Sequence, residues 1–131
     1  MKSAVVALSF FLISAFSSAE SYSEIDDMII AVTSGGETIE WKLHFGSEET
    51  SSCYLTGDIR IGTSTNIKSK SKMSIAYVRS GDILIIESPS GLCDAGAEVK
   101  LTLVDGLYEG DLLERSFYGY KVIGFVKEVE Q

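Results

Sequence analysis

Residues 37–45 read Glu-Thr-Ile-Glu-Trp-Lys-Leu-His-Phe, and they form the clearest strand pattern in the chain. Every second residue from Ile39 to Phe45 is apolar, and the residues between them are polar. Such a period of two is typical of an antiparallel strand with one face on the core and the other in water. Ser34-Gly35-Gly36 stands before it as a turn signal, because glycine tolerates positive φ angles. The stretch therefore predicts one arm of a β-hairpin.

The same alternation recurs along the chain, and no window keeps a helical period. Asp105-Gly106 favours the type I′ turn of a tight hairpin. The last stretch alternates less cleanly, with Val122 and Val126 on one side and Ile123 and Phe125 on the other, so bends are expected at its glycines. The expected strands cover residues 24–32, 37–45, 53–61, 67–78, 83–86, 98–103, 107–114 and 117–129.

This pattern predicts an all-β fold, in the form of a single small antiparallel β-barrel with about eight strands in up-and-down order. A two-sheet β-sandwich is the alternative. Hairpin signals dominate and no long Greek-key crossover is visible, which favours the barrel. No linker or long-period repeat divides the chain.

The N-terminus has the pattern of a cleaved signal peptide. Lys2 is followed by an apolar core over residues 4–15, and small residues at Ser17 and Ala19 predict cleavage after Ala19. We expect residues 1–19 to be removed and residues 20–131, or 131 − 19 = 112 residues, to form one all-β domain. The apolar core is shorter than the roughly 20 residues that span a bilayer. The expected location is periplasmic or extracellular.

Cys53 and Cys93 are the only two cysteines. In an oxidising compartment they are expected to form a disulfide that closes a loop of about 40 residues and stabilises the fold by about 4 kcal/mol. Free buried thiols would be the expectation in a reducing compartment.

The chain carries a formal net charge of −8, and loss of Lys2 makes it −8 − 1 = −9. Such an acidic protein is expected to be repelled by nucleic acid and by anionic membrane surfaces. A basic protein is the natural electrostatic partner, although the charge also serves solubility.

One segment departs from this balance, because residues 59–81 contain five cations and no carboxylate. Two interpretations stay open: lysines that guard an edge strand, or a docking face for an acidic partner or an anionic ligand. Tyrosines at a barrel mouth would suit an interface or a small-ligand pocket. The candidate interaction residues are Arg60, Lys68, Lys70, Lys72, Arg79, Tyr108, Tyr118 and Tyr120.

No catalytic or metal-binding motif is evident. His44 is the only histidine, it lies on the expected outer face of its strand, and no second histidine is present to share a zinc ion. Asp105, Glu109 and Asp111 do not have calcium-loop spacing. We expect no enzyme activity, no metal and no cofactor.

The layout resembles small periplasmic β-barrel lysozyme inhibitors in its size, its single disulfide and its Ser-x-Ser-Gly loop, here residues 88–91. In that family an aromatic or basic residue follows the loop closely. Here Leu92, Cys93 and Asp94 follow it. The resemblance covers four residues and a size class, and no function is carried over from it.

The sequence thus predicts an exported, non-enzymatic binding protein. The first expectation is a protein-interaction module, such as an inhibitor or immunity-type factor against an extracytoplasmic enzyme. The alternative is a carrier of a small apolar ligand with lipocalin-like architecture. Large inward residues such as Trp41, Phe45, Ile59 and Leu103 would either line or fill the interior of such a barrel.

Overall fold

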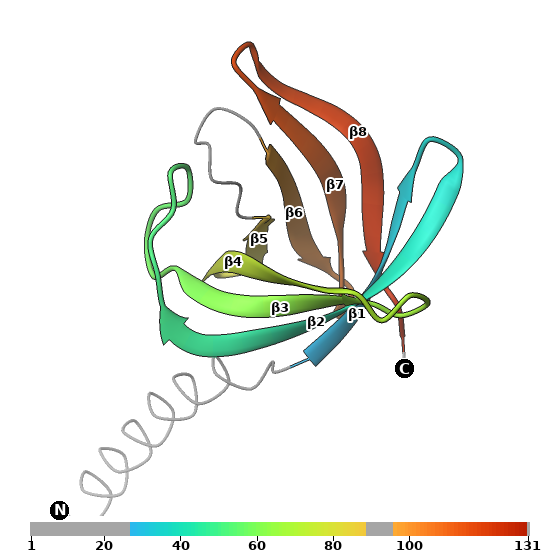
Figure 1. Cartoon of the computed structure of the whole chain (residues 1–131), viewed down its shortest axis with the longest axis horizontal. Helices are drawn as coiled ribbons and strands as arrows, with labels where there is room; N and C mark the ends of the chain where they lie inside the picture. The colour runs from blue at the N-terminus through green and yellow to red at the C-terminus, as the bar shows by residue number, and fades with distance from the viewer. Residues whose placement is uncertain (1–26, 89–95, 131) are drawn as a thin grey trace, which may run out of the picture.

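The computed structural model describes residues 27–88 and 96–130, and these form a closed antiparallel barrel of eight strands. Figure 1 shows the strands arranged around one interior in the order in which they occur along the chain. The predicted up-and-down barrel is confirmed, and the sandwich alternative is excluded. The strands are β1 (Asp27–Ser34), β2 (Glu37–Glu49), β3 (Arg60–Asn66), β4 (Lys72–Ser80), β5 (Ile83–Glu87), β6 (Gly96–Val104), β7 (Leu107–Ser116) and β8 (Gly119–Glu128).

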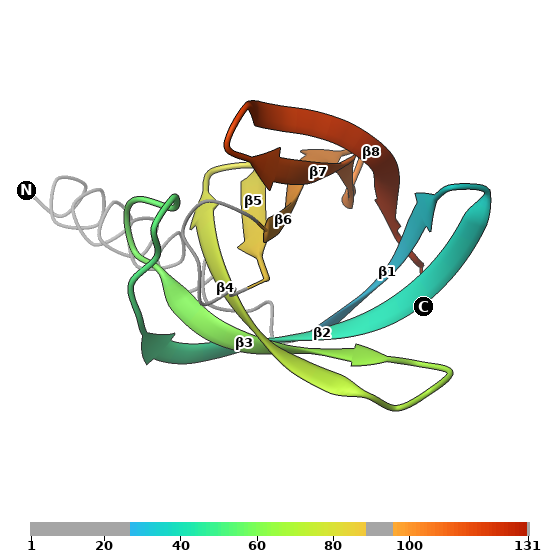
Figure 2. The same cartoon turned by 45° about the horizontal axis from the view of Figure 1, so that its top comes forward.

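The barrel closes where β1 pairs with β8. This seam is short and runs from Ile30 opposite Glu128 to Thr33 opposite Phe125, whereas β6 and β7 pair along nine residues. Figure 2, which brings the top of the molecule forward, shows the β1–β2 and β7–β8 hairpins diverging beyond the seam.

The alternation within each strand sends one set of side chains into the barrel. Leu43, Leu101, Tyr108 and Val126 are the largest fully buried side chains, and they belong to one core cluster with Met28, Phe45 and Leu84. These residues come from the ends of the strands that are remote from the β1–β2 hairpin. The barrel is therefore filled by side chains at this end, which we call the closed end.

The prediction of a strand over residues 53–61 is wrong. Residues 50–59 form a long connection, and β3 runs instead through residues 60–66, so that it overlaps the expected strand only at residues 60 and 61. Leu55 and Ile59 pack with Ala76 in a separate cluster, next to Val78 and Ile85. The side chains of Ile75 and Tyr77 point into the barrel, so the side chain of Ala76 between them points outward. This cluster therefore lies on the outside of the barrel. The connection buries its apolar residues there, and this accounts for the strand-like pattern.

The basic segment is not an edge strand. The β3 and β4 strands each have paired neighbours on both sides, so the interpretation of lysines that guard an open edge is wrong. The strand that was expected to begin at residue 67 begins at Lys72. Lys68 and Lys70 lie in the turn before it, and Lys70 has a positive φ angle of 65°.

The bend expected in the last strand is a register shift. β8 is in register with β7 up to Gly124 opposite Leu112, and then resumes with Val122 opposite Leu113. Ile123 is the extra residue, so the side chains beyond it change face. As a result Val126 is fully buried, whereas Val122 is 59% exposed.

Gly110 marks a close approach of β7 to β6. A Cβ atom added there would lie 1.8 Å from the carbonyl oxygen of Lys100, so only glycine fits at this position. The described residues include no helix that is long and apolar enough to cross a membrane.

Candidate functional site

A cavity of about 340 Å³ occupies the half of the barrel that is opposite the closed end. Its walls come from β1 to β7, so almost the whole circumference of the barrel contributes to it. The side chains that line it include Ile30, Val32, Ile39, Trp41, Leu43, Met73, Ile75, Ile86, Ala97, Val99 and Leu112. This surface is apolar and is built from the inward positions of the strand alternation.

Small side chains leave this space open. β3 contributes Ser64 where neighbouring β2 contributes Trp41 and Leu43, and β6 contributes Ala97 and Val99. A barrel of eight strands has an interior that side chains can fill or that can hold one small ligand. In this chain both occur, with filling at the closed end and a cavity at the other.

The polar groups of the cavity are few. Ser64 is buried in its wall, whereas Ser34, Glu37 and Ser88 line it from the ends of their strands or just beyond. Among the described residues that line it, none is a lysine, an arginine or a histidine. An apolar body with an uncharged polar end matches this distribution, and a carboxylate would meet no cation in the wall.

The cavity reaches the surface at the end that carries the β1–β2, β3–β4 and β7–β8 hairpins, which we call the mouth. Ile39 and Met73 line the cavity and are still 41% and 43% exposed. Next to the paired part of the seam, the Ser34 hydroxyl donates a hydrogen bond of 2.7 Å to the carbonyl oxygen of Ile123 and joins the two diverging hairpins. Beyond this bond, residues 119–122 of β8 have no partner in β1.

The structure brings five of the eight predicted interaction residues to the mouth end of the barrel and places the other three elsewhere. Lys68, Lys70 and Lys72 lie at the β3–β4 hairpin, and Tyr118 and Tyr120 lie at the β7–β8 hairpin. These two hairpins belong to the same end of the barrel but are not neighbours in the strand order.

The other three predicted residues lie elsewhere. Tyr108 is only 2% exposed and belongs to the core, and its hydroxyl has no hydrogen-bond partner among the described residues. Arg60, near the closed end, donates from Nε and Nη2 to the Asp58 carboxylate at 3.1 and 3.0 Å, and this pairing raises the pKa of Arg60. Arg79 lies one residue before the end of β4.

Sequence reasoning missed a buried ion cluster on the outside of the barrel. Arg115 is 4% exposed and donates from Nη2 to Glu87 Oε1 over 2.5 Å, while its Nη1 lies 3.7 Å from Glu98 Oε1. Residues of the 50–59 connection cover the cluster: the Ser52 hydroxyl donates to Glu87, and the Tyr54 ring lies 3.9 Å from the Arg115 guanidinium. Burial raises the pKa of the Glu98 carboxyl, and the charge of Glu87 raises it further, whereas Arg115 lowers it.

This cluster fastens the long connection to the sheet. Its charged groups face one another, with Arg115 between Glu87 and Glu98. No sequence signal distinguishes Arg115 from an ordinary outward residue, because its burial depends on a connection that is distant in sequence.

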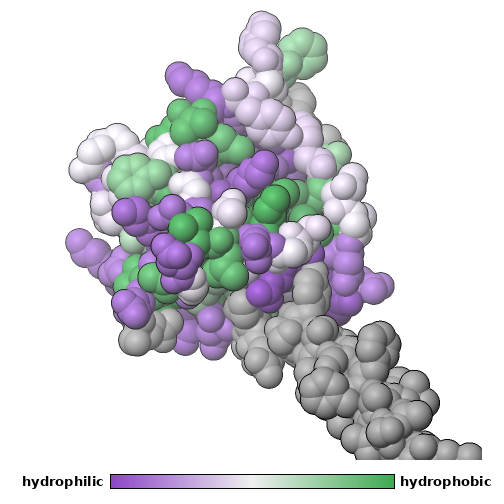
Figure 3. Space-filling model, turned by 180° about the vertical axis from the view of Figure 1, so that it is seen from behind, coloured by the Kyte–Doolittle hydropathy of each residue, from purple (hydrophilic) through white to green (hydrophobic). Residues whose placement is uncertain are grey.

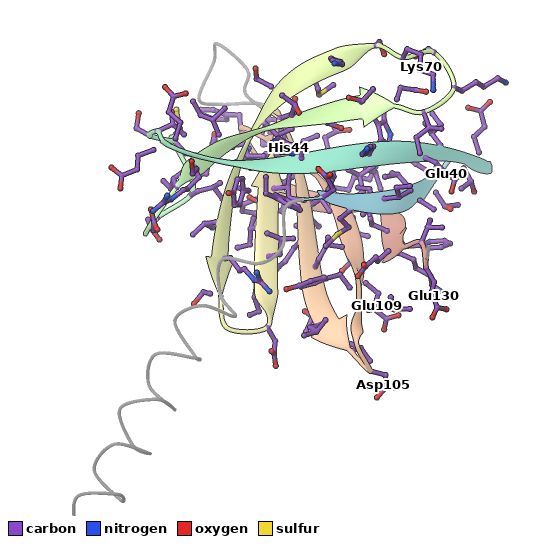
Figure 4. All side chains as sticks on the ribbon, turned by 90° about the horizontal axis from the view of Figure 1, so that it is seen from below. Glu40, His44, Lys70, Asp105, Glu109 and Glu130 are labelled. Atoms are coloured by element: carbon purple, nitrogen blue, oxygen red, sulfur yellow. The ribbon has the colours of Figure 1, made fainter. Side chains whose placement is uncertain are left out.

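His44 lies on the outer face of β2, as expected, and its Nδ1 is 2.8 Å from Asp27 Oδ1. Both side chains are about half exposed. Figure 4 shows His44 on the outer surface, away from the labelled residues of the hairpin tips. Among the described residues, no group of three or more histidine, cysteine or carboxylate side chains is placed to hold a metal ion.

The remaining predictions fall partly outside the described residues. The predicted signal peptide, residues 1–19, lies wholly outside the described residues. Of the Ser-x-Ser-Gly loop, only Ser88 is described. Cys53 lies in the 50–59 connection between Ser52 and Tyr54, and Cys93 is outside the described residues. The disulfide therefore stays a prediction.

The barrel, its cavity and its buried cluster can be set beside known proteins. No protein-family model matches the chain, and neither the curated proteins nor the solved structures contain a significant match.

Proposed function

We propose that the protein binds and carries one small, mainly apolar molecule inside the barrel. The observation that carries this proposal is the apolar cavity of about 340 Å³, which opens at one end of an otherwise filled barrel. Small-molecule sites are typically concave, mostly apolar and about 300–1,000 Å³ in volume. A carrier needs an apolar space of this size, open to solvent, to hold its ligand. A protein that needs only a stable core has no use for such a space.

The distribution of polar groups suggests the orientation of the ligand. Its apolar part would lie against Ile30, Leu43 and Ile86, which are almost fully buried. Its polar end would lie toward Ser34 and Glu37. Because the described lining has one carboxylate and no cation, a neutral ligand such as a long-chain alcohol is favoured over a carboxylate of the same length.

Trp41 provides a direct test, because it is the only tryptophan and it lines the cavity. Titration with the neutral apolar fluorophore N-phenyl-1-naphthylamine should quench Trp41 emission by energy transfer. We expect saturable binding with one site per barrel. Dodecanol should displace the fluorophore more effectively than dodecanoate.

A matched pair of variants locates the site. Val99→Phe places a larger side chain inside the cavity, whereas Val104→Phe makes the same change on the same strand at the opposite, exposed end. Val99→Phe should weaken binding at least about tenfold, and Val104→Phe should leave it unchanged. Absence of saturable binding, or equal binding by both variants, would refute the carrier.

The expectation of a protein-interaction or inhibitor-type module remains a prediction. Native mass spectrometry of the protein purified gently from its own source separates the two functions. A small-molecule adduct favours the carrier, whereas a copurified protein favours the interaction module.

A further inference from the structure

The two ends of the barrel differ in charge. At the mouth, the described turns 34–37 and 66–72 and the hairpin end 114–121 contain four lysines, the buried Arg115 and two carboxylates: Lys68, Lys70, Lys72, Lys121, Arg115, Glu37 and Glu114. At the closed end, Asp27 and the segments 46–60, 79–83, 104–107 and 128–130 contain eight carboxylates and two arginines: Asp27, Glu48, Glu49, Asp58, Asp82, Asp105, Glu128, Glu130, Arg60 and Arg79. In Figure 4 Lys70 of the mouth and Asp105 of the closed end lie on opposite sides of the molecule.

The mouth also carries the most exposed aromatic side chains. Phe117 and Tyr118 are 86% and 96% exposed at the turn between β7 and β8, and their rings form an edge contact with centroids 5.8 Å apart. Tyr120 follows and is 59% exposed. Figure 3 shows the tip of this hairpin projecting beyond the body of the barrel.

Exposed apolar rings at a projecting turn are costly in water and suit a boundary between water and an apolar phase. Tyrosine is enriched at such boundaries because its ring is apolar and its hydroxyl is polar. Lysines near an anionic lipid surface each contribute about a fivefold gain in affinity. Here both features surround the opening of a cavity whose ligand would be poorly soluble in water.

The net charge of −8 would repel an anionic surface if it were spread evenly. The expectation from sequence that anionic membranes repel the protein rested on this net charge. Because the described closed-end segments carry eight carboxylates and only two arginines, repulsion turns that end away and presents the mouth. Screening over about 8–10 Å at physiological salt further weakens the influence of the distant carboxylates.

We propose that the mouth of the barrel docks on a lipid surface that contains anionic headgroups, with the β7–β8 hairpin inserted at the headgroup level. Lys68, Lys70, Lys72 and Lys121 face the headgroups in this arrangement. The cavity then opens toward the bilayer, which is a source or destination for an apolar ligand.

The test is cosedimentation of the full chain, after any signal peptide is removed, with phosphatidylcholine–phosphatidylglycerol vesicles. We expect binding to these vesicles, weaker binding to pure phosphatidylcholine vesicles, and a fall in affinity as the salt concentration rises. A Phe117→Ser/Tyr118→Ser double variant should lose binding to both kinds of vesicle at least about tenfold. A Lys68→Glu/Lys72→Glu double variant should lose about tenfold or more on the anionic vesicles alone.

Matched controls lie at the other end of the molecule. Val104→Ser removes an exposed apolar side chain at the β6–β7 turn, and Lys127→Glu reverses an exposed charge near the end of β8. Both should bind vesicles as the unchanged protein does. All these substitutions are at exposed positions, and an unchanged urea midpoint would verify the fold of each variant.

Docking and ligand binding can fail separately. The hairpin variants should still bind N-phenyl-1-naphthylamine in the absence of vesicles, because none of their changes lines the cavity. Failure of the unchanged protein to bind anionic vesicles overturns the docking proposal, whatever the fluorophore shows. The docking proposal would also be overturned if the closed-end controls lost vesicle binding. The same holds if the protein does not bind vesicles but binds a protein partner through Phe117 and Tyr118.

Discussion

Arg115 and Glu87 form a short ion pair, with 2.5 Å between Nη2 and Oε1, on the outer face of the barrel and almost fully shielded from water. The pair lies beneath Ser52 and Tyr54 of the 50–59 connection, which are each more than thirty residues away in the chain from either partner. It thereby couples the 50–59 connection to β5 and β7. Glu87 lies closer to the Arg115 guanidinium than Glu98 does, so replacing the two carboxylates should have different effects on stability.

Replacing Glu87 should destabilise the protein strongly. Glu87→Gln removes the charge that is closest to a buried guanidinium and weakens the bond with Ser52. Removal of one partner from a buried ion pair typically costs about 3–5 kcal/mol. Urea unfolding should show a much lower midpoint with the same slope. A loss below about 1 kcal/mol would mean that Glu98 replaces Glu87 as the partner of Arg115.

Glu98→Gln should behave differently, because burial raises the pKa of Glu98 above its usual value of 4.5. The folded protein then holds this proton more tightly than the unfolded chain does. Stability from this group is therefore present below about pH 4.5 and is lost as the pH rises through the folded-state pKa. Relative to the unchanged protein, the variant should gain stability between about pH 4.5 and pH 7. Urea midpoints measured at both pH values test this, and a constant difference would contradict it.

The predicted disulfide should act on the same connection, since Cys53 stands between Ser52 and Tyr54. A Cys53–Cys93 bond should stabilise the folded state by about 4 kcal/mol. The mass of the intact protein should be lower by two hydrogens before reduction, and a reductant should lower the urea midpoint. A Cys53→Ser/Cys93→Ser variant should have the lower midpoint with and without reductant. A midpoint that does not respond to reductant, in a protein whose mass shows the bond, would refute the stabilisation.

The local pattern was sufficient to predict the barrel because most of its hairpins are encoded by adjacent residues. Alternation in residues 37–45 places Leu43 and Phe45 in the core. Asp105 and Gly106 adopt the positive φ angles, 51° and 85°, that their turn requires. In such cases the strand, its turn and its partner are neighbours in sequence, and local propensity agrees with the fold.

The sequence failed where burial depends on distant partners. Leu55 and Ile59 alternate as strand residues do, yet they cover the outside of β4 and β5. The cavity could not be predicted from the size of its lining residues either. Trp41 lines the cavity and Phe45 fills the closed end although both are large inward residues of one strand, because the outcome depends on what the other strands place opposite them.

Two core tyrosines allow a last prediction about the filled end of the barrel. The Tyr108 hydroxyl is buried and has no hydrogen-bond partner among the described residues, whereas the Tyr77 hydroxyl donates to the carbonyl oxygen of Gly46. An unsatisfied buried hydroxyl costs about 1–3 kcal/mol, whereas a satisfied one contributes about 1 kcal/mol.

Tyr108→Phe should therefore leave stability unchanged or raise it, because the ring stays packed and the unpaired hydroxyl is removed. Tyr77→Phe, the matched control, should lower stability by about 1 kcal/mol. Urea midpoints of the two variants make the comparison. A clear loss of stability in Tyr108→Phe would show that the Tyr108 hydroxyl forms a hydrogen bond in solution, most simply with a buried water molecule at the closed end.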